Sequence, residues 1–277
     1  MSSVGQTYVR RMRPVLGTFV EIGADTGHSH ANIEQAINAA FFVIQTIHDL
    51  LSFHELNSEL TRLNQAHGAF INVHNHTIRV LRLARGMMIS SEGLFNCTVG
   101  GMMVDSGVLP NHGGHAAPSG RAGDIEIKNG QVKLNRNVKI TLDGIAKGYA
   151  VDCAIAVMKR HGVASGWVNA GGDLRVYGNM TLPVQRRELD GSFTALGSLQ
   201  NAALASSHVG VECDANFPGR IVGERAIPAL GIWSVMSHFA WRADALTKVA
   251  SLANEHDRDD IVSQLGGKMV YLQQVTF

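Results

Sequence analysis

Charge is scarce in this sequence, and the two signs nearly cancel. Only 17% of the 277 residues are charged, and the formal net charge is +1 at pH 7. Binding to a polyphosphate backbone depends on a surplus of Lys and Arg, so we do not expect nucleic acid as a partner. An anionic ligand would therefore have to be held by a local arrangement of residues.

Cysteines and long apolar runs are also few. Cys97, Cys153 and Cys213 lie far apart and form no CxxC pair, which gives no sign of a disulfide framework or a zinc knuckle. No stretch reaches the roughly 18 to 20 apolar residues that a spanning helix requires. The first residues lack the apolar core and the cleavage site of a secretory signal. We therefore expect a cytoplasmic protein without membrane insertion.

Common nucleotide-binding and hydrolase motifs are missing as well. The chain contains no GxGxxG, no GxxxxGK[ST] and no GxSxG, so neither a Rossmann site, a P-loop nor a nucleophile elbow is indicated. His112 and His115, in HGGH, have no cysteine or carboxylate near them at a zinc spacing. We interpret them as loop residues.

Hydrophobic residues, at 45%, and thirty glycines indicate a folded protein with many turns. Apolar residues recur at three and four positions in the stretches that we predict as helices: residues 32–51, 77–91, 145–161, 243–253 and 257–264. Ser58 is expected to begin a shorter helix, SELTRLN.

Strands are predicted between these helices. Asn129-Gly130 lies between two alternating segments and predicts a hairpin closed by a type I′ turn, whose second strand could continue into VKITLDG. Other strands are expected at residues 15–22, 166–178, 195–204, 231–237 and 269–275. We predict an α+β fold, a single integrated domain over residues 1–277. Its two lobes would have mixed or antiparallel sheets, flanking helices and a ligand cleft between them.

The segment TLDGIAKGYAVD, residues 141–152, carries the first chemical signal. Asp143-Gly144 turns into a helix, where unpaired backbone N–H groups favour an anion, and Lys147 adds an ammonium group to the same region. This combination suits a phosphate or a pyrophosphate. An ordinary turn followed by a solvated lysine explains the same residues.

Asp244 and Thr247, in ADALTK, carry the second signal. Side chains three apart lie on one face of a helix, so a carboxylate and a hydroxyl could converge on a hard cation such as magnesium. Helix capping by Asp244 is the alternative. A third feature, Gly171-Gly172, allows close approach of a ligand or of another strand, and a β-bulge is an equal alternative.

Together these segments resemble the FAD:protein FMN transferase family, the ApbE-type flavin transferases once described as thiamine biosynthesis lipoproteins. LGTFVEI, beginning at Leu16, resembles the family's opening MGT strand. The other matching segments follow in the family's order: HDLLSFHELNSELTRLN, FNCTVGGM, DGIAKGYAVD, VNAGGDLRVYG and ADALTK. Ordered matches over most of the chain are more specific than any single motif.

The resemblance implies a site for FAD and a magnesium ion. Family members move FMN from FAD onto a Thr or Ser hydroxyl of a target protein and release AMP. It implies metal ligation by Gly144, Asp244 and Thr247, with catalytic roles for Asp244 and Lys147. The nucleotide and flavin contacts that it implies come from these residues: Leu16, Phe95, Asn96, Thr141, Asp143 and Lys147.

Several positions depart from the family pattern. The family's FD is FN at Asn96, Thr141 stands where many members have an acid, and the spacing between Asp244 and Thr247 is three rather than four. The HxxDPxTG segment is absent, because FPGRIVGERAIPALGIWSV contains neither His nor Asp-Pro. Three functions therefore stay open: an FMN transferase acting on a flavin-accepting protein, an FAD-binding accessory protein without transfer, and a magnesium-dependent FAD pyrophosphatase.

Overall fold

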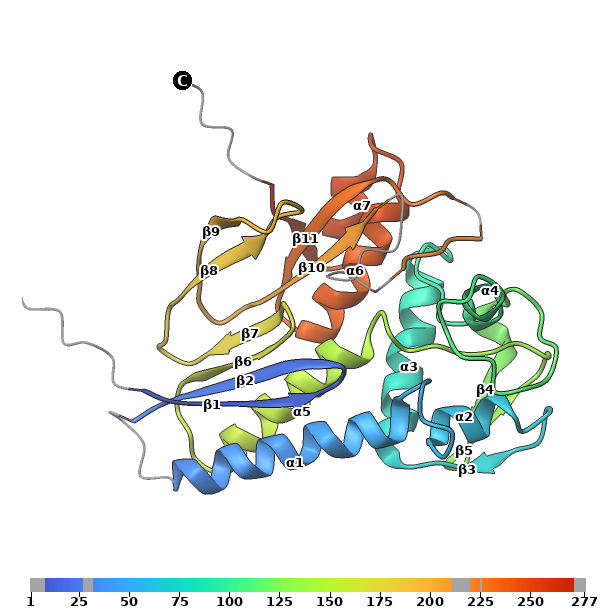
Figure 1. Ribbon diagram of the computed structural model, residues 1–277, viewed down its shortest axis with the longest axis horizontal. Helices are drawn as coiled ribbons and strands as arrows, with labels where there is room; N and C mark the ends of the chain where they lie inside the picture. The colour runs from blue at the N-terminus through green and yellow to red at the C-terminus, as the bar shows by residue number, and fades with distance from the viewer. Residues whose placement is uncertain (1–7, 27–31, 211–219, 225, 272–277) are drawn as a thin grey trace, which may run out of the picture.

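The computed structural model describes residues 8–26, 32–210, 220–224 and 226–271. At its centre is an antiparallel sheet with the strand order β1-β2-β6-β7-β10-β11-β12 (Figure 1). Its strands are β1 (Tyr8–Val15), β2 (Thr18–Asp25), β6 (Gly166–Ala170), β7 (Asp173–Tyr177), β10 (Ala203–Val209), β11 (Gly231–Ser237) and β12 (Gly267–Met269).

Both faces of this large sheet are covered. The helices α5 (Ala146–Arg160) and α6 (Ala240–Leu252) pack on one face, and α1 (Ile33–Leu51) packs against α5. A ribbon of β8 (Leu182–Arg187) and β9 (Phe193–Leu199) packs on the other, where apolar side chains of the ribbon and of the sheet form a second cluster around Trp167. The sheet, these helices, the ribbon and α7 (Arg258–Gln264) form the large-sheet lobe.

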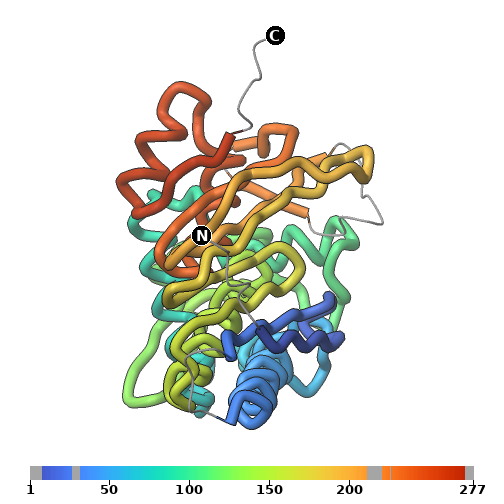
Figure 2. Tube along the Cα trace, turned by 90° about the vertical axis from the view of Figure 1, so that its left-hand side faces the viewer, coloured from blue at the N-terminus to red at the C-terminus, as the bar shows by residue number. Residues whose placement is uncertain are grey.

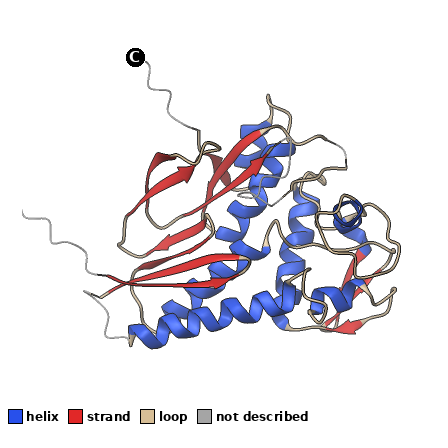
Figure 3. Cartoon of the chain, viewed as in Figure 1, coloured by secondary structure: helices blue, strands red, loops and turns tan. Residues whose placement is uncertain are grey.

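The remaining elements form a second lobe, residues 52–142, which we call the small-sheet lobe. It consists of α2 (Glu59–Asn64), α3 (Asn75–Ser90), α4 (Gly100–Asp105), a turn of 3-10 helix (Ala122–Asp124) and the sheet β3 (Ile71–Asn72), β5 (Gln131–Leu134) and β4 (Ile125–Lys128). Figure 3 shows these helices and short strands grouped beside the large sheet. The predicted α+β class, with two lobes and antiparallel sheets, is confirmed.

The first two helices begin within one residue of their predicted starts. The Asn32 side chain caps α1 by accepting a hydrogen bond from the Gln35 amide at 3.1 Å, and Ser58 caps α2 by accepting from Thr61 at 3.0 Å. Such caps satisfy backbone N–H groups that have no partner within the helix. Figures 1 and 2 both show α1 and the β1–β2 hairpin at one end of the molecule and the C-terminal helices at the other.

Three hairpins have two-residue turns in which both residues adopt positive φ, and the sequence predicted one of them. Asn129 and Gly130 adopt φ of 51° and 79°, which confirms the predicted turn. The predicted single strand at residues 15–22 is wrong, because Leu16 and Gly17 adopt φ of 60° and 68° and turn β1 back onto β2. Gly171 and Gly172 likewise join β6 and β7, so residues 166–178 form a hairpin rather than one strand.

Other strand predictions need correction. Residues 195–204 do not form one strand, because residues 200–202 separate the end of β9 from the start of β10. The second strand of the Asn129-Gly130 hairpin does not continue into VKITLDG, because β5 ends at Leu134 and Val138 and Lys139 make only isolated bridges. Of the predicted strand at residues 269–275, only Met269 belongs to β12, and residues 270–271 follow its end. Residues 272–275 lie outside the described part of the chain, as Cys213 does.

Within the residues described, no helix combines the length and the apolar character needed to cross a membrane.

Candidate functional site

A cavity of about 1410 Å³ opens between the two lobes. The large-sheet lobe contributes the β1–β2 turn, the β6–β7 turn and parts of β8 and β10, and the small-sheet lobe contributes residues 94–97 and 108–109. Pockets for drug-sized ligands occupy about 300–1,000 Å³, so this cavity is large enough for a bigger ligand such as a dinucleotide. Its position matches the predicted cleft.

The turn before α5 forms one wall of the cavity. Thr141, Asp143, Gly144 and Lys147 all line it. Asp143 is exposed and faces the cavity, and desolvation by the protein around its carboxylate raises its pKa above the ordinary value. The predicted nucleotide-binding residues are therefore together on one surface.

Asp244 and Thr247 lie behind this surface. Both side chains are fully buried, and neither lines the cavity. Asp244 is the fifth residue of α6, which begins three residues before its predicted start, so the capping alternative is wrong. The Oδ2 atom of Asp244 instead accepts a hydrogen bond from the Gly148 amide at 3.2 Å, which ties α6 to the first turns of α5. The two distant segments therefore meet, as the metal hypothesis required.

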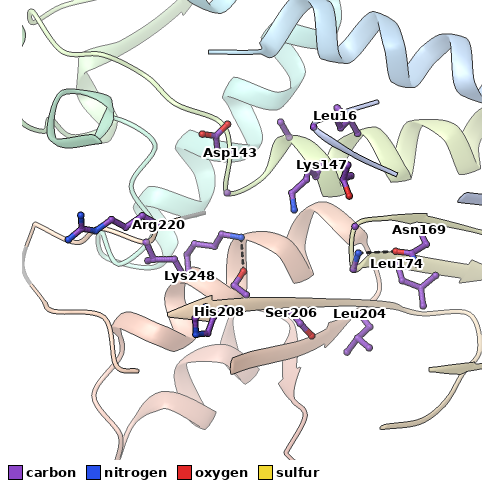
Figure 4. A pocket seen from close by; sticks show the side chains of 18 of the residues that line it. Leu16, Asp143, Lys147, Asn169, Leu174, Leu204, Ser206, His208, Arg220 and Lys248 are labelled. Atoms are coloured by element: carbon purple, nitrogen blue, oxygen red, sulfur yellow. Dashed lines mark hydrogen bonds between the residues drawn. The ribbon is translucent and has the colours of Figure 1, made fainter. Parts of the chain in front are cut away.

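Lys248 is the charged residue of α6 that lines the cavity (Figure 4). Its Nζ lies 2.6 Å from Oδ1 of Asp244 and 3.0 Å from the hydroxyl oxygen of Ser207 on β10. The sequence analysis missed Lys248, although a lysine four residues after an aspartate on a helix is placed to form an ion pair with it.

Lys147 is paired rather than freely solvated. Its Nζ lies 3.2 Å from Oδ2 of Asp173, at the start of β7, and its side chain stays 36% exposed. The Asp173 charge raises the pKa of Lys147 above its ordinary value, so the ammonium stays charged. Burial, and then the negative charge of Asp244, raise the pKa of Asp173 to about 6. The solvated-lysine alternative is therefore wrong.

Leu16, Phe95 and Asn96 also line the cavity. The Asn96 side chain donates to the Gly120 carbonyl at 3.1 Å and accepts from the amide and the hydroxyl of Thr98 at 2.8 and 2.6 Å. Asn96 thus fixes the loops that form this wall. Leu16 and Phe95 provide apolar surface, and their contact with a flavin stays a prediction.

Two arginines of the large-sheet lobe, each paired with a glutamate, also line the cavity. Arg186 on β8 lines it and donates to both carboxylate oxygens of Glu188, at 3.0 and 3.1 Å. Arg10 on β1 lines it too and pairs with Glu21 at 2.7 Å. The sequence analysis missed both residues because it predicted neither β1 nor β8.

The fold and the cavity define an α+β protein whose two lobes enclose a large cavity with ammonium groups in its wall. The ApbE family model matches residues 16–212, well over half of the chain. This chain belongs to the ApbE family. No curated protein sequence matches it.

Solved structures resemble the whole fold. Flavin Transferase ApbE from Vibrio cholerae is 18% identical, with a TM-score of 0.76 over 92% of this chain and 90% of the other. The apo form of flavinyl transferase ApbE from Pseudomonas stutzeri is 16% identical, with a TM-score of 0.76 over 94% and 89%. The ApbE protein from Thermotoga maritima is 21% identical, with a TM-score of 0.76 over 94% and 93%.

Proposed function

We propose that this chain is a flavin transferase that moves the FMN part of FAD onto a Thr or Ser hydroxyl of a flavin-accepting protein. The hydroxyl oxygen forms a bond to the phosphorus on the FMN side, the bridging P–O bond breaks, and AMP leaves with the electron pair. Membership in the ApbE family and the flavin transferase names of two similar structures support this activity. The observation that carries it is the dinucleotide-sized cavity with Lys147 and Lys248 in one wall.

The proposed roles follow from charge and position. Phosphoryl transfer depends mainly on holding the reactants and on neutralising the charge of the phosphates. Lys147 and Lys248 line the cavity and supply positive charge to the diphosphate. Asp143 faces the same space with a raised pKa, and its carboxylate accepts the proton of the attacking hydroxyl. Leu16 and Phe95 contact the flavin or its ribityl chain.

The predicted magnesium ion does not fit the residues present. Both carboxylate oxygens of Asp244 already accept hydrogen bonds, one from Lys248 and one from Gly148. The buried Thr247 hydroxyl donates to the main-chain carbonyl of Asp244 at 2.7 Å and lies 2.7 Å from that of Ser207. Magnesium needs several open oxygen ligands in octahedral geometry. The proposed transfer therefore includes no step through a metal, and Asp244 acts by positioning Lys248.

The experiment combines the purified chain with FAD and a protein bearing an acceptor threonine. We expect a covalent flavin adduct by mass spectrometry and an equal amount of AMP by chromatography. Asp143→Asn should slow adduct formation by about 10²- to 10⁴-fold, the usual contribution of a general base, with little change in FAD affinity. The exposed Asp49 on α1 provides a matched control, because Asp49→Asn should leave the rate unchanged.

Other products would assign a different function. FAD that stays bound and intact would indicate an accessory protein. Free FMN and AMP without an adduct would indicate an FAD pyrophosphatase. An Asp143→Asn variant as fast as the parent chain would remove Asp143 from its proposed role.

FAD affinity should rise as the pH falls from about 8 to about 5. Asp173 gains a proton near its raised pKa of about 6, while the pKa of Lys147 is raised above its ordinary value, so that ammonium stays charged over this range. Loss of one negative charge strengthens the attraction for the diphosphate, and about tenfold tighter binding corresponds to about 1.4 kcal/mol. Titration followed by flavin fluorescence measures the FAD affinity at each pH. Asp173→Asn should remove this part of the pH dependence, and an affinity that rises with pH would contradict it.

A further inference from the structure

The ammonium group of Lys248 lies where three parts of the site meet. Its Nζ contacts Asp244 on α6 and Ser207 on β10, at 2.6 and 3.0 Å. Its Cε lies beside the turn before α5, because a Cβ added to Gly144 would be only 3.3 Å from it. The side chain is 19% exposed, and that exposed part faces the cavity (Figure 4).

A chain of hydrogen bonds holds this ammonium in place. Lys248 donates to the Ser207 hydroxyl, and the Thr247 hydroxyl donates its only proton to the main-chain carbonyl of Asp244. Ser207 must therefore be the donor in its 2.7 Å hydrogen bond with Thr247. The network leaves Thr247 oriented toward protein partners rather than toward the cavity.

One positive charge already compensates the buried carboxylate. Asp244 is fully buried, and a buried charge is stable only when it is paired and hydrogen-bonded. Lys248 supplies the positive charge, and the Gly148 amide supplies the second hydrogen bond. No group of three or more His, Cys, Asp or Glu side chains in the described part of the chain is arranged to hold a metal ion.

The spacing of residues in ADALTK also indicates that Lys248, rather than a metal ion, pairs with Asp244. The segment that ADALTK resembles has a threonine four residues after the aspartate, and in this chain that position is Lys248. Residues four apart lie on one face of a helix, so a lysine there reaches the carboxylate directly. A cationic side chain thus stands where the segment that ADALTK resembles has a threonine.

We infer that the Lys248 ammonium is the resident cation of this site and takes the place of a divalent metal beside the diphosphate. FAD binding to this chain is then independent of magnesium. The identity of the ligand in this inference rests on the proposed function, whereas the ion pair between Lys248 and Asp244 does not.

Binding measurements with and without magnesium test the inference. The FAD affinity of the parent chain is followed by flavin fluorescence. We expect the same affinity in the presence of a chelator and in excess magnesium. Lys248→Thr should lose about tenfold or more in affinity in the chelator, because it loses a charge near the diphosphate. Magnesium should restore that loss, because the variant offers a hydroxyl and an unpaired carboxylate as ligands.

Two further variants show whether weaker FAD binding comes from the loss of the ammonium group or from a folding defect. Asp244→Asn combined with Lys248→Met removes both charges, so no buried charge is left unpaired, and its weakened FAD binding should not respond to magnesium. Lys128→Met, on the exposed end of β4, should behave as the parent chain does. Calorimetry with magnesium alone should give binding heat for Lys248→Thr and none for the parent chain.

The outcomes separate this inference from the proposed function. A parent chain whose FAD affinity falls in the chelator and returns with magnesium would overturn the inference and leave the transferase proposal in place. A parent chain that binds no FAD in any condition would overturn both.

Discussion

Replacing Gly148 with alanine should destabilise the protein, although alanine is the better helix former. Gly148 lies where α5 crosses α6, and an added Cβ would lie 2.3 Å from the Ala240 carbonyl oxygen and 2.7 Å from the Trp241 Cα. Both are backbone atoms, so the helices must move apart. Overpacking of this kind costs about 1–3 kcal/mol or more, which exceeds the gain of about 1 kcal/mol in helix propensity. Denaturant unfolding measures the change.

A second helical glycine provides the control. Gly86 in α3 has no atom within 4 Å of its added Cβ, so Gly86→Ala should stabilise the protein by about 0.5–1 kcal/mol. Gly148→Ala should also weaken FAD binding, because the same crossing holds Lys248 beside Gly144. Equal effects of the two substitutions would show that the crossing is not tightly packed.

Asp152→Ala should have the largest effect on stability. From α5, this carboxylate accepts hydrogen bonds from the Ala240 and Trp241 amides, at 3.1 and 2.9 Å, and from Arg175 on β7. It therefore caps α6 from a neighbouring helix and joins both helices to the sheet. Removing one partner of a nearly buried ion pair costs about 3–5 kcal/mol, because the remaining charge is left without compensation.

The loss of stability in Asp152→Ala should be much larger than the loss caused by removing an ordinary surface charge. Asp49 on α1 is exposed and accepts a single hydrogen bond, from Gln45, so Asp49→Ala should change stability by no more than about 0.5 kcal/mol. Asp152→Asn keeps an oxygen acceptor for α6 and should lose less than Asp152→Ala. A loss near that of Asp49→Ala would mean that Arg175 and the α6 amides find other partners.

Features of the fold that depend on local chemistry were predictable from the sequence. Asn129-Gly130 specifies its turn because both residue types adopt positive φ readily. Leu16-Gly17 forms the same kind of turn, but leucine gives no such signal, so the sequence predicts one strand in place of the hairpin. The sheet imposes this turn by pairing β1 with β2 along their whole length. Tertiary contacts of this kind cannot be recognised from a short stretch of sequence.

The candidate site was predictable in position more than in chemistry. The motifs around Asp143 and Phe95 both line the cavity. The residue types at Asp244 and Thr247 suggested metal ligands, but composition does not show which way a side chain faces or which partner already holds it. Asp173 was missed because its pairing with Lys147 depends on how β7 packs against α5.

The walls of the cavity come from segments as far apart in the chain as Leu16 and Leu252. Closing loops of that length requires most of the polypeptide to be ordered first. Ligand binding can therefore begin only at a late stage of folding, and a fragment that ends before α6 would lack the Lys248 side of the site. Added FAD should accordingly protect the whole chain from proteolysis rather than one region of it.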